Sequence, residues 1–183
     1  MRKKGTKLVG VISDLHAPFH DKRATEMALD YLSSLKLDKL VLLGDMFDFL
    51  SVSNYRRTLL SRANLSQELE ESKEMLSSIR KKVGRGVDMV FLKGNHEDRW
   101  NRYLKDRAPE LDGVEHFELK SILELNKFNV KWVDKKWIYN GMIFYHGDGR
   151  CSRNSGYTVT SWLRHFKQST IIGHIHRLGV VYN

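Results

Sequence analysis

Residues 40–48 read Leu-Val-Leu-Leu-Gly-Asp-Met-Phe-Asp, and this stretch decides the fold. Four consecutive apolar residues bounded by a glycine are typical of a strand that is buried on both faces. Two carboxylates, Asp45 and Asp48, follow the glycine that ends this run. Similar apolar runs occupy four other segments, and we expect each of them to be a strand: residues 8–12, 87–92, 142–145 and 170–172.

Helical patterns separate these runs. Residues 24–35 carry apolar side chains three and four positions apart, which predicts an amphipathic helix with six residues on one face: Ala24, Met27, Ala28, Tyr31, Leu32 and Leu35. Three further helices are predicted at residues 65–83, 97–107 and 157–166. Asn140-Gly141 between two apolar runs predicts a hairpin, and residues 180–182 are interpreted as a last strand. Because a helix joins the first two strands, those strands should be parallel.

Composition excludes several classes of protein. The 183 residues are 41% hydrophobic and 29% charged, with only two prolines, so we expect one folded α/β domain over residues 1–183. No apolar run is long enough to cross a bilayer or to act as an export signal. The single cysteine, Cys151, allows no internal disulfide, which favours a cytoplasmic protein. The net charge of +9 is compatible with a polyanionic partner but does not identify one.

Residues that can bind metal ions follow each of the five apolar runs quoted at the start. The strand ends read Asp14-Leu15-His16, Gly44-Asp45 with Asp48 further on, Gly94-Asn95-His96-Glu97, His146-Gly147-Asp148 and Gly173-His174-Ile175-His176. Five of the eight histidines lie in these segments. Because ligands bind beyond the carboxyl ends of the strands in open α/β sheets, we expect the five ends to converge on one place.

Each of these segments also has a simpler interpretation when it is taken alone. Aspartate is common in a turn after a strand, and Asn95 could simply cap a helix. Their combined occurrence at five strand ends favours a metal site. The other three histidines do not follow a strand and are interpreted as surface or partly packed side chains: His20, His116 and His165.

The types of donor indicate which metal ions the site would take. Carboxylates, imidazoles and an amide without a thiolate suit Mn²⁺, with Fe, Zn²⁺ and Ni²⁺ as alternatives. Seven candidate ligands exceed what one ion needs when water must also bind, so we expect two divalent ions.

Together, Asp14-x-His16, Gly44-Asp45-x-x-Asp48, Gly94-Asn95-His96-Glu97, His146 and Gly173-His174-x-His176 resemble the calcineurin-like metallophosphoesterase family. The resemblance extends over residues 14–176 and is strongest to small stand-alone bacterial or phage members. It implies an α/β fold, an αββα sandwich of two mixed sheets flanked by helices, with the dimetal site at the carboxyl ends of the strands.

The resemblance also implies a role for each motif residue. One metal ion would be held by Asp14, His16 and His176, the other by Asn95, His146 and His174, and Asp45 would bridge both. His96 would hydrogen-bond the substrate or protonate the leaving group, and Asp48 would orient His96. The position after Asp48 is Phe49, where protein phosphatases of the family have an arginine, so a protein-phosphatase activity is not favoured.

The predicted function is therefore a dimetal-dependent phosphoesterase that hydrolyses phosphodiesters through a metal-bridging hydroxide, without a serine or cysteine nucleophile. Nucleic acid is the leading substrate candidate, because the net charge of +9 accompanies residues 99–107, which mix cations with aromatic side chains. Taken alone, this segment is more simply interpreted as an ordinary helix with a solvated basic face. Arg150, Arg153 and Arg177 are candidates for substrate binding. The alternatives are a phosphomonoesterase acting on small molecules and a non-catalytic scaffold subunit.

Overall fold

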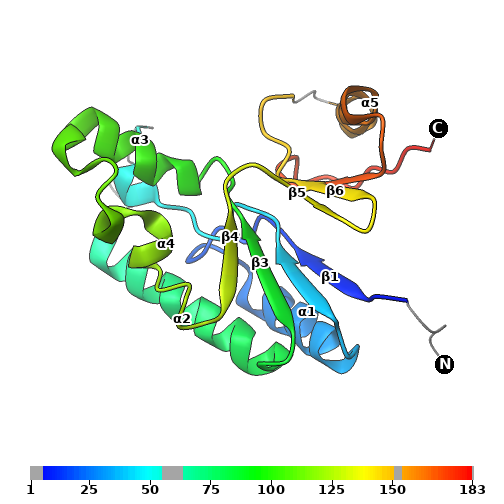
Figure 1. Ribbon diagram of the computed structural model, residues 1–183, viewed down its shortest axis with the longest axis horizontal. Helices are drawn as coiled ribbons and strands as arrows, with labels where there is room; N and C mark the ends of the chain where they lie inside the picture. Colours follow the sequence, from blue (N-terminus) through cyan, green and yellow to red (C-terminus); the bar gives the residue numbers. More distant parts are fainter. Residues whose placement is uncertain (1–5, 55–63, 151–153, 183) are drawn as a thin grey trace.

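The computed structural model describes residues 6–54, 64–150 and 154–182 (Figure 1). Within these ranges the strands are β1 (Val9–Ile12), β2 (Lys39–Leu42), β3 (Asp88–Leu92), β4 (Val130–Val133), β5 (Lys136–Tyr139), β6 (Met142–Tyr145) and β7 (Thr170–Ile172). The α-helices are α1 (Lys22–Ser34), α2 (Leu65–Val83), α3 (Glu97–Arg107), α4 (Leu119–Ile122) and α5 (Ser155–Phe166). Short 3-10 turns occupy Leu50–Val52, Pro109–Leu111 and Glu115–Phe117.

The first sheet has the order β1-β2-β3-β4, and all of its neighbouring strands are parallel. Side chains along β2 alternate between two cores. Leu40 and Leu42 pack in a core shared with the helices, whereas Val41 and Leu43 pack in a second core that includes Phe144 of β6. Both faces of this sheet are therefore covered, which explains why the run at residues 40–43 is apolar at every position.

The second sheet has the order β5-β6-β7 and combines an antiparallel hairpin with a parallel pair. The hairpin turn is made by Asn140 and Gly141, with φ angles of 48° and 75°. Two successive positive φ angles match the right-handed twist of the flanking strands, which is why Asn-Gly is favoured there. The predicted hairpin is confirmed.

The layers follow the order helix, sheet, sheet, helix. Figure 1 shows α1 and α2 along one face of the first sheet and α5 on the outer side of the second sheet. Trp162 and Phe166 of α5 lie against Tyr145 of β6, with ring centroids 4.8 and 5.7 Å away. The expectation of two mixed sheets is correct only for the second one. The described strands of the first sheet are all parallel, because a helical crossover leads to each strand after β1.

The face of α1 that enters the core differs from the predicted one. Met27 and Tyr31 are 64% and 65% exposed, while Thr25 and Leu29 are buried and Leu32 is partly buried. The three covered residues are spaced by four and three positions and form the stripe that meets the core. Apolar spacing identified the helix correctly, but it did not determine which part of a wide apolar surface would be covered.

Two strand assignments also differ from the prediction. β4 was not predicted, because Lys131 interrupts its apolar pattern, yet Trp132 stacks on Phe91 of β3 with ring centroids 5.2 Å apart. The strand expected at residues 180–182 is wrong: this segment pairs with no strand in the described part of the chain, and Tyr182 is 89% exposed. No helix among the described residues is both long and apolar enough to span a bilayer.

Candidate metal centre

Backbone hydrogen bonds join the loop that follows β1 to the loop that follows β2, and the loop that follows β6 to the one that follows β7. The N–H of Asp14 donates to the carbonyl of Gly44 at 3.1 Å, and the N–H of His16 donates to that of Asp45 at 3.0 Å. The N–H of Gly173 donates to the carbonyl of His146 at 2.8 Å. The strand ends thus bring the predicted ligand residues together, as their positions in the sequence indicated.

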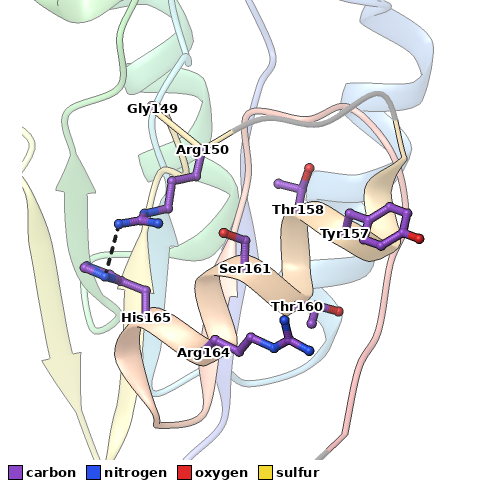
Figure 2. A pocket seen from close by; sticks show the side chains of 8 residues that line it. All are labelled: Gly149, Arg150, Tyr157, Thr158, Thr160, Ser161, Arg164 and His165. Atoms are coloured by element: carbon purple, nitrogen blue, oxygen red, sulfur yellow. Dashed lines mark hydrogen bonds between the residues drawn. The ribbon is translucent and has the colours of Figure 1, made fainter.

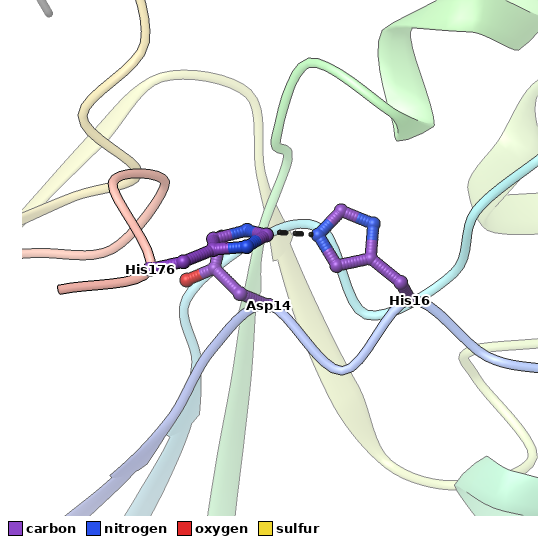
Figure 3. Close-up of side chains that lie close together, drawn as sticks. All are labelled: Asp14, His16 and His176. Carbon is purple, nitrogen blue, oxygen red and sulfur yellow. Dashed lines mark hydrogen bonds and ion pairs between the residues drawn. The ribbon is translucent and has the colours of Figure 1, made fainter. Parts of the chain in front are cut away.

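Asp14, His16 and His176 form one group of potential ligands (Figure 3). Their ligand atoms all lie within 4.8 Å of one another. Nε2 of His16 is 3.1 Å from Nε2 of His176, which in turn is 3.4 Å from Oδ1 of Asp14. The His176 side chain is 57% exposed, so this group opens to solvent.

A second group of potential ligands consists of Asp45, His146 and His174, whose ligand atoms also lie within 4.8 Å of one another. Asp45 and His146 are buried, whereas His174 is partly buried. Nε2 of His146 is 3.1 Å from Oδ2 of Asp45 and 3.1 Å from Oδ1 of Asn95. Asp45 belongs also to a third group with His16 and His96. The Asp45 carboxylate therefore lies between the buried group and the exposed group.

The environment of His146 fits a bound cation. Its Nδ1 donates to the carbonyl of Leu43 at 2.9 Å, which leaves Nε2 to face the oxygens of Asp45 and Asn95. Burial lowers the pKa of His146, but the hydrogen bond and charge of Asp45 outweigh it and raise this pKa to about 9. A nitrogen held against two acceptor oxygens calls for a proton or a metal ion. The donor set of carboxylates, imidazoles and an amide suits a divalent metal without thiolate ligands.

Two glycines allow this close packing. A methyl group on Gly94 would overlap the carboxylate of Asp45 and come within 2.5 Å of the Asp45 nitrogen. A methyl group on Gly173 would overlap the Ser13 hydroxyl and lie 2.6 Å from Oδ2 of Asp14. Side chains at these positions would displace residues of both ligand groups.

Glu97 is a residue of the site whose role the sequence analysis did not identify. Its fully buried carboxylate accepts hydrogen bonds from the backbone N–H groups of Asp45, Met46 and Gly94 at 2.9 Å each, and from that of Phe47 at 3.2 Å. Glu97 thus fixes the loop after β2 to the loop after β3. The sequence did contain a signal for this role, because Glu97 lies in the first turn of a helix that directly follows a strand end.

His96 and Asp48 lie beside both ligand groups. Nδ1 of His96 is 3.3 Å from Nδ1 of His16 and 3.0 Å from the backbone carbonyl of Asp48. Oδ2 of Asp48 is 3.4 Å from Nδ1 of each of these two rings. Burial raises the pKa of Asp48, but His16, His96 and the nearby Arg99 together hold it well below its usual range. The Arg99 contact was not predicted.

The three candidate arginines lie in different places. Arg150 turns onto α5, where its guanidinium is 3.4 Å from Nδ1 of His165 (Figure 2). The guanidinium also lies over the ring of Trp162. It borders a hollow of about 710 Å³ that Arg164 and Ser161 also line. Arg177 is exposed and follows His176 directly. Arg153 lies outside the described residues.

The three histidines that were not assigned to the site differ in their surroundings, and Nδ1 of His20 is buried without a hydrogen-bond partner among the described residues. His116 and His165 are exposed, and His20 is partly buried.

Comparisons with known proteins agree with this geometry. A family model described as calcineurin-like phosphoesterase matches residues 7–178. The Gene 54 protein of Mycobacterium phage L5 is 29% identical over 182 residues, which cover 96% of this chain and 71% of the relative. The Gene 54 protein of Mycobacterium phage D29 is 27% identical over 182 residues, with the same coverage of both chains. Neither name states an activity, so the substrate must be argued from the site.

Proposed function

Since the chain belongs to the calcineurin-like phosphoesterase family, we propose that it hydrolyses phosphodiesters at a centre of two divalent metal ions. The family is one of metal-dependent phosphoester hydrolases, and the choice of a diester, of two ions and of Mn²⁺ as the preferred metal is our proposal. Fe, Zn²⁺ and Ni²⁺ are the alternative metals, given the same donor set.

The observation that carries the proposal is the position of Asp45. Its carboxylate shares one group of potential ligand atoms with His146 and His174 and another with His16 and His96. A single carboxylate between two sets of imidazoles is the arrangement expected of a residue that contacts two ions. The side chain is also 2% exposed and receives the N–H of His96 at 2.9 Å on Oδ1, so it is fixed before any ion binds.

Each ligand group would hold one ion. Asp14, His16 and His176 would bind the exposed one, and Asn95, His146 and His174 the buried one. Divalent ions held there would supply Lewis acidity that polarises the phosphate and makes water more acidic. The protein contributes by fixing the donors: His146 through the carbonyl of Leu43, and Asp45 through Glu97, which accepts its N–H.

His96 is the side chain that we assign to the leaving oxygen, to which it would hydrogen-bond or give a proton. It lies beside both ligand groups, and Asp48 holds it through a backbone carbonyl 3.0 Å from Nδ1. Replacing His96 by alanine should slow a substrate with a poor alkoxide leaving group by about 10²- to 10⁴-fold. The loss should be much smaller with a p-nitrophenolate leaving group, which needs no proton.

A nucleic acid is the diester that the charge distribution favours. The chain carries a net charge of +9, and α3 presents Arg102, Lys105 and Arg107 on its exposed side. Arg102 donates to the carbonyl of Asn95 at 3.0 Å, so this cation lies next to the proposed ligands. Phosphate contacts by such residues provide affinity without reading sequence.

A cytoplasmic location remains a prediction from the single cysteine.

The test compares substrates and metals on the purified full chain. Chelation should abolish hydrolysis of bis-p-nitrophenyl phosphate, and added Mn²⁺ should restore it better than Mg²⁺. Oligonucleotides should be cleaved, and p-nitrophenyl phosphate should be hydrolysed more slowly than the diester. Faster hydrolysis of the monoester would assign a phosphomonoesterase instead, and no hydrolysis with any metal would leave a non-catalytic subunit.

A further inference from the structure

Arg99 of α3 lies inside the candidate centre, although the motifs in the sequence assign no separate role to it. Its side chain is 12% exposed. One terminal nitrogen of its guanidinium donates to the backbone carbonyl of Asp48 at 2.7 Å and to Oδ1 of the same residue at 2.9 Å. A bond to a carboxylate and a bond to a carbonyl from one nitrogen hold this planar group in a defined orientation.

The other terminal nitrogen of Arg99 reaches His96. It lies 3.0 Å from Nε2 of the ring, while Nδ1 of the same ring lies 3.0 Å from the carbonyl of Asp48. Because a guanidinium only donates, Nε2 accepts this hydrogen bond and the neutral ring carries its proton on Nδ1. Both nitrogens of His96 are thus held, one of them by Arg99.

The carboxylate of Asp48 lies farther from His96 than the backbone carbonyl of the same residue does. Its Oδ2 is 3.4 Å from Nδ1 of His96, which is long for a hydrogen bond, and it is equally far from Nδ1 of His16. The short contacts of Asp48 are those from its carbonyl to His96 and from its carbonyl and Oδ1 to Arg99. Arg99 therefore connects the carboxylate of Asp48 to the imidazole.

The position directly after Asp48 cannot supply this cation. Phe49 occupies this position, and its side chain is fully buried. Its ring centroid lies 6.1 Å from that of Phe47, and its own backbone φ is 53°. The chain brings a guanidinium to the same aspartate from α3 instead.

The surface ion pairs of α3 differ from the Arg99 contacts. Lys93 and Arg102 both pair with Asp98, whose side chain is 37% exposed and belongs to none of the ligand groups. Such exposed pairs typically contribute little. The Arg99 contacts are largely shielded from solvent, and both of their partners are residues of the candidate centre.

We propose that Arg99 is a positioning residue that fixes the His96 ring beside Asp48 before the substrate binds. To act on the leaving oxygen, Nε2 exchanges the hydrogen bond from Arg99 for a proton taken from water, which it then donates, while the guanidinium keeps its two bonds to Asp48. The inference rests on the proposed function, because it assumes that His96 acts in phosphodiester hydrolysis. Loss of Arg99 should leave substrate binding intact and lower turnover by allowing the ring to move. A lysine should not replace it, since one ammonium group cannot span the Asp48 carboxylate and Nε2 as the planar guanidinium does.

The kinetic test is a double-mutant cycle of Arg99→Ala and His96→Ala in the Mn²⁺-loaded enzyme. With a dinucleoside monophosphate, whose leaving group is a poor alkoxide, Arg99→Ala should lower kcat by about 10- to 100-fold and leave KM nearly unchanged. In the His96→Ala background the same change should have almost no further effect, because both variants remove the same action. Arg99→Lys should behave like Arg99→Ala, and Arg23→Ala on α1 removes one exposed positive charge as the control.

A metal-independent measurement checks the contact itself. In metal-free protein labelled with ¹⁵N-histidine, the spectrum of the neutral His96 ring should show the proton on Nδ1. Arg99→Ala should change this signal, whereas Arg23→Ala should not. If Arg99→Ala folds poorly, the same spectrum can be recorded on Arg99→Lys, and the inference can still be tested.

Several results would overturn the inference. Additive losses in the cycle would mean that Arg99 acts on its own, and full activity of Arg99→Lys would mean that only its charge matters. An unchanged His96 signal in both Arg99 variants would also contradict it. In each of these cases metal-dependent hydrolysis by the wild type would still support the proposed function. Absence of hydrolysis in the wild type would overturn both.

Discussion

The two ligand groups of the centre differ in how far they are shielded from water. In the buried group, the side chains of His146 and Asp45 are 0% and 2% exposed. In the exposed group, the side chain of Asp14 is 13% exposed and that of His176 is 57% exposed. The buried group follows β2, β3, β6 and β7, whereas His176 lies further along the segment after β7. That segment leads to the exposed side chains of Leu178, Val180 and Tyr182.

This difference indicates a division of labour between the two groups. The buried group is fixed by hydrogen bonds with the main chain: His146 donates to the carbonyl of Leu43, and the carboxylate of Asp45 accepts from the N–H of His96. The exposed group is fixed at Asp14, which accepts the N–H of His174 at 2.9 and 3.0 Å, while His176 extends into solvent. We expect the buried group to retain its ion more tightly and the exposed group to admit substrate.

Asp45→Asn should break both groups at once and have the largest effect. The amide keeps the shape but removes the negative charge that both groups share. Activity should fall by at least about 10²- to 10³-fold, the loss typical of removing one group that stabilises developing charge. Elemental analysis should find little bound metal in a folded protein. Asp30→Asn on α1, whose carboxylate pairs with Lys82 at the surface, is the control and should keep full activity.

The pH dependence of stability should report on the buried group. Burial lowers the pKa of His146, but Asp45 raises it to about 9, above the ordinary value of 6.5. A raised pKa stabilises the folded state fully below pH 6.5, and this contribution is lost as the pH rises through 9. Urea unfolding of the metal-free protein should therefore show a loss of up to about 3 kcal/mol between these values.

Bound metal should remove this dependence, because an ion held by Nε2 of His146 would replace its proton. His146→Gln should flatten the profile of the metal-free protein. A free energy of unfolding that stays constant or rises over this range would contradict the assignment of His146.

Replacing one histidine in each group compares the two groups directly. His146→Ala should abolish binding of one ion at every metal concentration tested, because it removes the imidazole whose Nε2 lies 3.1 Å from the oxygens of both Asp45 and Asn95. His176→Ala should keep two sites, with the exposed one weakened by about 10- to 100-fold, so that excess metal restores activity. Calorimetric titration with Mn²⁺ measures both. If the weaker of the two Mn²⁺ sites bound its ion more tightly in His146→Ala than in His176→Ala, the assignment of the tighter site to the buried group would be wrong.

The sequence predicted most of the architecture because the decisive elements are buried on both faces. Leu40, Val41, Leu42 and Leu43 could be recognised as a strand by composition alone, and the resemblance to the calcineurin-like family, stated from the strand-end motifs, is confirmed by the match over residues 7–178. β4 could not be recognised, because an edge strand with Lys131 in its middle depends on a neighbour, β3, that local sequence does not reveal.

For the candidate site, the sequence predicted which residues lie close together but not how they are held. Glu97 and Arg99 were both visible as charged residues in a first helical turn, a pattern that many surface helices share. Their contacts with the loop after β2 connect residues about fifty positions apart, and only the folded chain shows them. The metal roles of the seven proposed ligands remain predictions.

The smallest expected effect concerns the entry of substrate over the exposed group. Arg177 follows His176 directly and is exposed, whereas Arg85 is an equally exposed arginine in the turn that leads into β3, at the opposite end of that strand from Asn95. If a single-stranded oligonucleotide approaches over the exposed group, Arg177→Ala should lower the slope of log affinity against log salt by about 0.7, the value of one phosphate contact. Arg85→Ala should leave the slope unchanged, and neither variant should alter hydrolysis of bis-p-nitrophenyl phosphate, because that substrate has no neighbouring phosphate.

Equal shifts in the two variants would show that net charge alone attracts the oligonucleotide, and an unchanged slope in Arg177→Ala would place the entry path elsewhere. A shift confined to Arg177→Ala would indicate that the substrate approaches over the exposed group, whereas the buried group serves mainly to hold its ion.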